Sequence, residues 1–142
     1  MRSLLDVNVL IALFDPDHSL HSQAIGWLDE NGKAGWASCP LTQNGCIRIM
    51  SQPRYVNALP VNAVAERLRA AVSHSRHEFW PDDVSALDEG LIDFTRVHGP
   101  KQLTDVYLLA LAASKGGRLV TFDRALPLAA AIKAQRKHLV VI

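Results

Sequence analysis

The sequence predicts an α/β fold, an α/β/α sandwich in which a central parallel sheet of about five short strands lies between layers of helices. Strand-like and helix-like segments alternate along the 142 residues, and such alternation favours a parallel sheet flanked by helices. Nearly half of the residues are apolar, enough for the core of one domain over residues 1–142. The segment 106–113 is apolar on nearly every side, as a buried central helix is.

Turn residues divide the chain into its expected elements. Asp15-Pro16-Asp17 stops one helical segment, Asn31-Gly32 stops the next, and Lys115-Gly116-Gly117 stops the apolar one. The expected elements are, in chain order, a strand that ends at Asp6, helices over 8–14 and 20–30, a strand over 34–37, a helix that begins at Pro40, a helix over 61–73, a strand over 78–80, helices over 84–97 and 106–113, a strand over 118–122 and a last strand over 140–142.

The helix that begins at Pro40 carries a residue of functional interest. Proline is favoured at the first position of a helix because its missing N–H is not needed there. From that start, spacings of four and seven residues place Gln43 on one inward face with Ile47 and Met50. We therefore expect the Gln43 side chain to face the interior and the cleft.

Three aspartates occupy positions where an α/β chain places metal ligands. Asp6 ends the first strand, and Asp123 follows the strand over 118–122. Ligands bind beyond the carboxyl ends of parallel strands, so these two side chains share one cleft if their strands are neighbours. Thr104 is the expected N-cap of the apolar helix, whose positive end keeps Asp105 ionised. Three hard oxygen ligands indicate a metal-dependent phosphodiesterase.

Each aspartate alone has an ordinary explanation, because Asp is common in turns and at helix starts, where it accepts hydrogen bonds from free backbone N–H groups. The convergence of all three under one fold carries the prediction. A phosphorylated regulatory domain also uses an aspartate cluster, but such a domain usually needs a lysine near the last strand. This chain has Thr121-Phe122-Asp123 there.

Four further polar residues are candidates for supporting roles. Asn8 and Thr121 each lie two residues from an aspartate, where they can orient the carboxylates or make ordinary turn hydrogen bonds. Arg48 lies on the helix begun by Pro40, and Arg124 follows the last aspartate. Both arginines are candidates to contact phosphates that flank a scissile bond, with surface salt bridges or solvation as the alternative.

Composition limits the classes of partner. The formal net charge is +1, so any contact with nucleic acid depends on a local patch or on a bound metal. Cys39 and Cys46 lie seven residues apart with no companion pair, which indicates reduced thiols in a cytoplasmic protein. No apolar stretch approaches the roughly 20 residues that a membrane span requires, so we expect no membrane contact.

Four segments carry a resemblance to a known family: Leu-Leu-Asp-Val-Asn-Val-Leu-Ile-Ala-Leu over 4–13, Leu-Thr-Gln-Asn-Gly-Cys-Ile-Arg-Ile over 41–49, Leu-Thr-Asp-Val-Tyr-Leu-Leu-Ala over 103–110 and Thr-Phe-Asp-Arg-Ala-Leu over 121–126. In this order they resemble PIN domains, most closely the VapC-type toxins of bacterial toxin–antitoxin pairs. The resemblance implies an endoribonuclease dependent on Mg²⁺ or Mn²⁺, a homodimer, an RNA substrate and a VapB-type antitoxin. Asp6, Asp105 and Asp123 match its metal-binding positions.

The chain departs from that family at Gln43, where the pattern usually has glutamate. Glutamine keeps the length and one carbonyl acceptor, but it has no charge and cannot act as a base. Because hard divalent cations favour carboxylate oxygens, this replacement is expected to weaken the site. Two hypotheses follow from the resemblance. The chain is either an active endoribonuclease with reduced activity, or a PIN-fold module that binds antitoxin or RNA without cutting.

Overall fold

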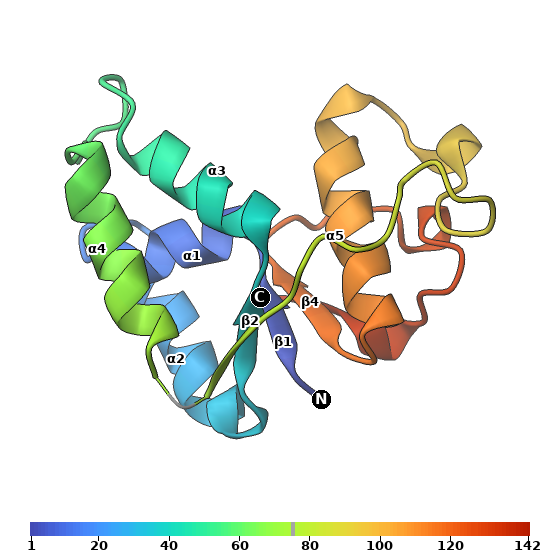
Figure 1. The fold of residues 1–142 in the computed structure, drawn as a ribbon, viewed down its shortest axis with the longest axis horizontal. Helices are drawn as coiled ribbons and strands as arrows, with labels where there is room; N and C mark the ends of the chain where they lie inside the picture. Colours follow the sequence, from blue (N-terminus) through green and yellow to red (C-terminus); the bar gives the residue numbers. More distant parts are fainter. Residues whose placement is uncertain (75) are drawn as a thin grey trace.

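A five-stranded parallel sheet forms the centre of the computed structural model, which describes residues 1–74 and 76–142 (Figure 1). The strand order is β3-β2-β1-β4-β5, and every neighbouring pair is parallel. The predicted fold class is therefore confirmed. The strands are β1 (Ser3–Leu5), β2 (Trp36–Ser38), β3 (His77–Phe79), β4 (Arg118–Thr121) and β5 (Leu139–Val141).

Helices cover both faces of this sheet. Figure 1 shows α5 on one side of the sheet and the other labelled helices on the opposite side. Their starts and ends lie within a few residues of those expected from the turn signals. The helices are α1 (Val7–Phe14), α2 (His21–Asn31), α3 (Pro40–Met50), α4 (Val61–Val72) and α5 (Leu103–Ser114).

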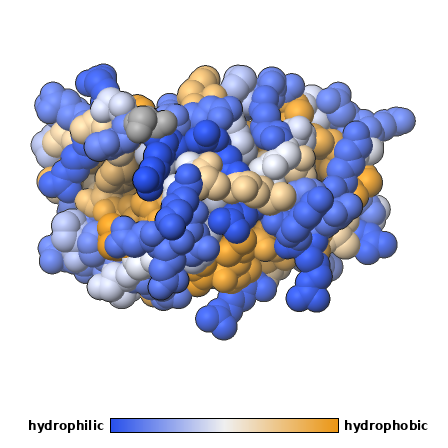
Figure 2. Space-filling view, turned by 90° about the horizontal axis from the view of Figure 1, so that it is seen from below, coloured by the Kyte–Doolittle hydropathy of each residue, from blue (hydrophilic) through white to orange (hydrophobic). Residues whose placement is uncertain are grey.

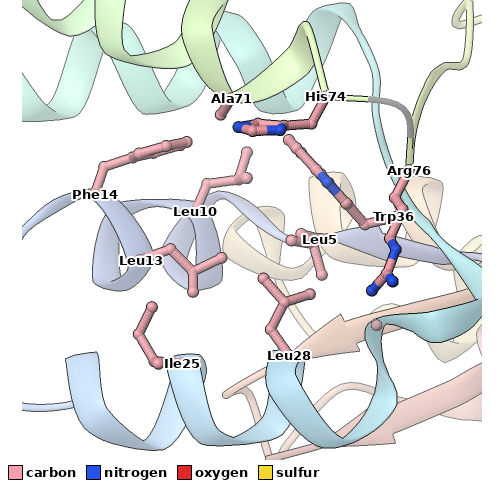
Figure 3. A pocket seen from close by; sticks show the side chains of 11 residues that line it. Leu5, Leu10, Leu13, Phe14, Ile25, Leu28, Trp36, Ala71, His74 and Arg76 are labelled. Atoms are coloured by element: carbon pink, nitrogen blue, oxygen red, sulfur yellow. The ribbon is translucent and has the colours of Figure 1, made fainter.

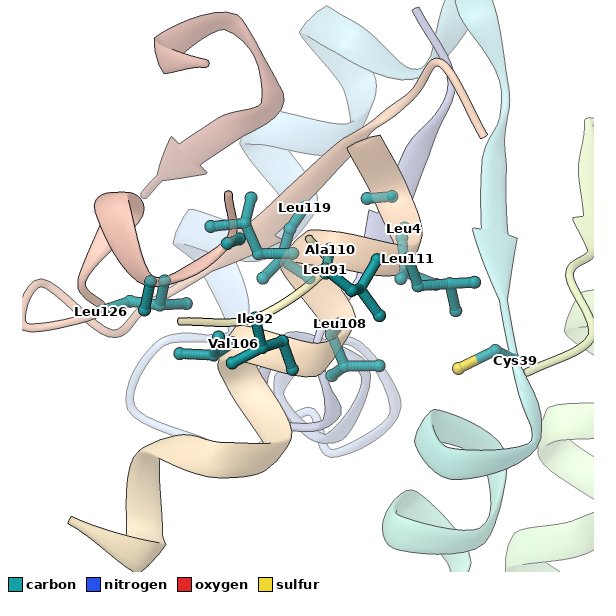
Figure 4. Close-up of a cluster of buried hydrophobic side chains, with 14 of the residues drawn as sticks. Leu4, Cys39, Leu91, Ile92, Val106, Leu108, Ala110, Leu111, Leu119 and Leu126 are labelled. Atoms are coloured by element: carbon teal, nitrogen blue, oxygen red, sulfur yellow. The ribbon is translucent and has the colours of Figure 1, made fainter. Parts of the chain in front are cut away.

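Alternate residues of the central strands build two separate cores. Leu4 pairs in register with Leu119, and both pack with α5 in one buried cluster (Figure 4). The next residues along each strand, Leu5 and Val120, enter the second cluster with α1 and α3. Because successive side chains of a strand point to opposite faces, the two-residue period divides the core between the faces. Both central strands are therefore buried on both sides, with apolar residues at their centres and polar residues only at their ends, as is common in parallel sheets.

The expected helix over 84–97 is wrong. This segment consists of turns, with only a short 3₁₀ helix at Phe94–Arg96. Some of its backbone groups make short turn bonds within the segment, and others bond far outside it: the Asp93 N–H donates to the Ala130 carbonyl, and the Leu91 carbonyl accepts from the Ile132 N–H. Gly90, at φ +85°, turns the chain in the middle. These long-range bonds replace the helical ones and bury Leu91 against α5.

The expected cap of α5 is also wrong. A 3₁₀ turn over Pro100–Gln102 runs directly into the helix, which begins at Leu103 with Gln102 at the N-cap position. Thr104 is therefore inside the first turn, exposed, and its hydroxyl makes no cap hydrogen bond. Asp105 does lie in the first turn, as expected.

Hydrophilic side chains dominate the face shown in Figure 2, with apolar patches between them. In the described ranges, 1–74 and 76–142, no helix is long and apolar enough to cross a membrane. Cys39 and Cys46 are both buried free thiols, and burial raises the pKa of each, to about 11 for Cys39 and about 12 for Cys46. Both cysteines are therefore unreactive core residues at neutral pH.

Candidate active site

Asp6 lies at the junction of β1 and α1, where it is the N-cap of the helix. One carboxylate oxygen accepts from the Val7 N–H at 2.7 Å, and the other accepts from the Thr121 hydroxyl at 2.7 Å. Only 2% of the residue is exposed, and this burial raises the pKa of its carboxyl. Asp6 is thus held in one orientation by donors from both β1–α1 and β4.

Asp123 occupies the turn after β4, beside Asp6. The register pairs Leu5 with Val120, so the carboxyl ends of β1 and β4 are adjacent. The Thr121 hydroxyl, which donates to Asp6, also accepts from the Asp123 N–H at 3.0 Å. Thr121 therefore links the two acidic positions through one buried oxygen.

Asp105 reaches the same cluster from α5, on the opposite face of the sheet. Burial, the Asp6 carboxylate and a close contact with Asp123 raise the pKa of Asp105 to about 7. Part of this shift comes from the like charges of Asp6 and Asp123, which act on Asp105 in a partly desolvated place. The fold therefore brings the three predicted aspartates together, although they lie 117 positions apart at the extremes, from 6 to 123.

A cleft of about 390 Å³ opens over Asp6 and Asp105. Sequence patterns singled out Arg48 and Asn8 near it but passed over Asn44 and Lys101. Asn44 is four residues from Arg48 on the same helical face, so its position was available from the helix period. The cleft is lined by Asp6, Val7, Asn8, Leu41, Asn44, Gly45, Arg48, Ile49, Lys101, Thr104 and Asp105.

Gly45 allows α3 to approach the beginning of α1. A Cβ added at Gly45 would lie 2.8 Å from Cγ2 of Val7, closer than side chains tolerate. Val7 is the residue whose N–H binds Asp6. The absent side chain thus lets the Asn44 and Arg48 face of α3 lie next to the acidic cluster.

Gln43 shares a face of α3 with Ile47, as expected, and is not among the residues that line the cleft over Asp6 and Asp105. Its side-chain amide donates to the Ser38 hydroxyl at 2.9 Å, and Ser38 Oγ lies 2.8 Å from Nε2 of His77. This chain of contacts runs along β2 and β3, on the far side of β2 from β1 and β4. Gln43 also faces a groove with α4 residues such as Leu68. Gln43 and Asn44 are adjacent residues, about 100° apart around the helix axis, and the period alone did not show which of these faces meets which neighbour.

Gln43→Glu is expected to lower the free energy of unfolding by about 1 kcal/mol and to leave Mn²⁺ affinity unchanged. Burial and the charge of Arg2 lower the pKa of His77, so its ring is neutral at pH 7. With the amide donor gone, the Ser38 hydroxyl would have to turn its hydrogen to the new carboxylate, and His77 would keep its contact with Ser38 only as the tautomer protonated on Nε2. Urea unfolding and Mn²⁺ calorimetry of both proteins measure the two effects. A tenfold gain in Mn²⁺ affinity would return position 43 to the acidic cluster.

Two other predicted residues are peripheral. Asn8 lines the cleft and is exposed, and in the part of the chain that the structure describes its side chain makes no hydrogen bond to an aspartate. Arg124 is exposed in the turn after Asp123 and is absent from the lining of the cleft.

The donor chemistry of the cluster fits a hard divalent cation that keeps water ligands. Across residues 1–74 and 76–142, no three Asp, Glu, His or Cys side chains are close enough to enclose an ion by themselves. Mg²⁺ rarely needs such a cage, because it usually binds one or two carboxylates and completes its shell with water and substrate phosphates. Burial raises the pKa values of Asp6 and Asp105, and repulsion between the carboxylates adds to both shifts; a cation would offset that repulsion.

A second, apolar cleft of about 470 Å³ lies between α1, α2 and α4, away from the aspartates (Figure 3). Leu10 and Leu13 from α1 and Leu28 from α2 point into it, and Trp36 and Arg76 lie at its other end. Ile25 at its rim is 37% exposed. This cleft lacks acidic side chains and is therefore a surface for apolar groups rather than for a metal.

Known proteins match both the sequence and the fold. The PIN domain family model matches residues 3–132. The chain is 51% identical over 143 residues to Ribonuclease VapC44 of Mycobacterium tuberculosis, covering 100% of both. In fold it is similar to the M. tuberculosis VapC20 crystal structure, described as a Sarcin-Ricin loop cleaving toxin, with a TM-score of 0.64, 12% identity and coverage of 93% of this chain and 98% of that one.

A further structural neighbour is VapBC2 from Rickettsia felis, solved bound to a DNA fragment from its promoter, with a TM-score of 0.57, 12% identity and coverage of 100% of this chain and 98% of that chain. These two structures support the fold, whereas the full-length sequence match extends to a named ribonuclease. The chain therefore belongs to the PIN domain family and, within it, to the VapC ribonucleases.

Proposed function

We propose that this chain is a metal-dependent endoribonuclease, the toxin of a type II toxin–antitoxin system, which hydrolyses RNA phosphodiester bonds. The observation that carries the proposal is the convergence of Asp6, Asp105 and Asp123, of which Asp6 and Asp105 line one open cleft. A full-length match to a VapC ribonuclease supports the reaction class. Mg²⁺ or Mn²⁺ is the proposed cofactor because carboxylate oxygens suit hard cations.

The chain's own residues prepare the site for this reaction. One or two carboxylates of the Asp6, Asp105 and Asp123 cluster, with water, would hold the cation, which would polarise a phosphoryl oxygen and lower the pKa of water. Thr121 keeps one oxygen of Asp6 in place through its hydrogen bond. Asp105, whose pKa is about 7, would have to be ionised to serve as a ligand. Without the cation, the cluster repels a polyanion.

A VapB-type antitoxin is the proposed partner. The structural neighbour VapBC2 supports this proposal. The apolar cleft between α1, α2 and α4 is the surface we assign to it, because an exposed apolar hollow is typical of a site for a partner's apolar side chains. Homodimer formation, which the family resemblance implies, stays a prediction.

The alternative function is a module that binds antitoxin or RNA without cutting. It assumes that Gln43 replaces an acidic residue of the metal site and so inactivates it. The hydrogen bond from Gln43 to Ser38 gives this side chain a structural role of its own, which supports the active enzyme.

The test uses the purified chain with a mixed RNA pool, in MnCl₂ or in EDTA. Cleavage products in Mn²⁺ alone, and their loss when the product of the neighbouring antitoxin gene is added, are the expected results. Absence of metal-dependent products from correctly folded protein would favour the silent module instead.

A further inference from the structure

Two cations border the acidic cleft from different walls. Arg48 extends from α3, and Lys101 from the 3₁₀ turn before α5. Both are exposed, and within residues 1–74 and 76–142 neither side chain forms an ion pair. A cation whose role was to neutralise the nearby carboxylates would pair with them. Arg48 and Lys101 instead remain free for an anion that enters the cleft.

Hydrogen bonds hold the Lys101 turn in register with the acidic cluster. The neighbouring Gln102 accepts from the His98 N–H at 3.0 Å and donates to the Ala125 carbonyl at 3.3 Å. Ala125 belongs to the turn of Asp123, since its N–H donates to that carboxylate at 2.8 Å. Lys101 is thus placed relative to Asp123 through Gln102, although its side chain is free.

Arg48 is placed with comparable firmness on the opposite wall. The close approach of Gly45 to Val7 sets α3 against α1 beside Asp6. Arg48 follows Gly45 by three residues and shares the cleft with it. Each wall therefore carries one cation at a position fixed relative to a different aspartate.

We propose that Arg48 and Lys101 bind the phosphates on the two sides of the reacting phosphate in an RNA strand. The inference rests on the proposed function, because it concerns the substrate of the same site. A strand lying across the cleft presents one phosphate to the acidic centre and its neighbours to the two rims. The rim cations offset the repulsion between the carboxylates and the strand, and they set the register of the reacting phosphate.

Salt dependence of RNA binding provides the first test. Binding of a fluorescein-labelled single-stranded RNA of mixed sequence is measured in EDTA between about 50 and 300 mM KCl, for the parent and for Lys101→Gln and Arg48→Gln. Each loss of one phosphate contact is expected to reduce the slope of log affinity against log salt by about 0.7, and the double variant by about 1.4. Lys101→Arg is expected to keep the parent slope.

Lys133→Gln is the matched control. Lys133 is also an exposed lysine, but it lines a separate cleft beside α5 with Asp88 and Glu89. We expect its removal to leave the slope unchanged. In Mn²⁺, Lys101→Gln is expected to raise the KM for RNA by about fivefold or more while kcat changes by less than about twofold, the signature of lost substrate binding. Unchanged melting temperatures exclude a structural cause.

Three outcomes overturn or separate the claims. The assignment of these cations to RNA would be overturned if both variants kept the parent's slope of log affinity against log salt. It would also be overturned if Lys133→Gln reduced that slope by the same amount. Intact RNA binding with weakened antitoxin binding would also overturn it and assign the cations to the antitoxin. If the parent does not cleave RNA but both variants show the reduced salt slope, the proposed reaction is wrong and the proposed phosphate contacts are confirmed.

Discussion

Asp105→Asn is expected to reduce Mn²⁺-dependent RNA cleavage by at least about a hundredfold, about 2.7 kcal/mol of barrier, while stabilising the metal-free protein. The substitution removes one cation ligand, so activity falls. It also removes a carboxylate that burial, Asp6 and Asp123 disfavour, so the repulsion in the metal-free cluster falls. Because the side chain is partly exposed, we expect a gain of only about 1 kcal/mol at pH 8, or about 3 °C.

Cleavage of a mixed RNA pool and thermal melts in EDTA measure the two effects. Asp6→Asn is the second variant. Its amide oxygen can accept from the Val7 N–H, and the Thr121 hydroxyl can rotate to accept from the amide NH₂. Asp6→Asn should therefore lose activity while the protein stays folded. An Asp105→Asn protein that cleaves as fast as the parent would remove Asp105 from the site.

Mn²⁺ affinity is expected to fall by up to about tenfold per pH unit below pH 7, because the ion competes with a proton on Asp105. The pKa of Asp105 is about 7 in the folded protein, against 3.8 for the unfolded group. Between these values the folded state binds the extra proton. Its contribution to stability is therefore complete below pH 3.8 and is lost as the pH rises through about 7.

Mn²⁺ calorimetry and metal-free melts between about pH 5.5 and 8 test this dependence. The melting temperature of the metal-free parent should fall across that range, and excess Mn²⁺ should reverse the fall. In Asp105→Asn, the melting temperature of the metal-free protein should no longer fall across this pH range because of this group. A parent whose Mn²⁺ affinity is flat across this range would show that Asp105 is already ionised without the cation.

Local patterns in the chain were sufficient for the architecture. Apolar runs such as 4–5 and 119–120 are strands buried on both faces, and 103–114 is apolar because it is a helix covered on nearly every side. These features depend on residue type and on the period of apolar residues, and both can be read from the segment's own sequence. The same holds for the aspartates at strand ends and in the first helical turn, because parallel strands always direct their carboxyl ends to one edge.

The segment 84–97 shows where local patterns fail. Its sequence pattern predicts a helix, but no α-helix forms because backbone groups of Ala130 and Ile132 bond to the backbone of this segment. These partners lie some 40 residues away along the chain. Thr104 lost its expected capping role for a related reason, since the turn over 100–102 begins the helix earlier. Helix propensity describes an isolated segment. In the folded chain, hydrogen bonds to distant segments compete with the helical ones and can replace them.

The sequence by itself determined the α/β class, the parallel sheet and the convergence of three aspartates, because each follows from periodicity and from the geometry of strand ends. Only the tertiary structure decided which face of α3 meets the acidic cleft. The close contact between Gly45 and Val7 and the bond from Gln43 to Ser38 set the rotation of that helix, so Arg48 faces the cleft and Gln43 faces β2 and α4. The rotation of a helix about its axis depends on contacts between distant segments, and these exist only once the chain has folded.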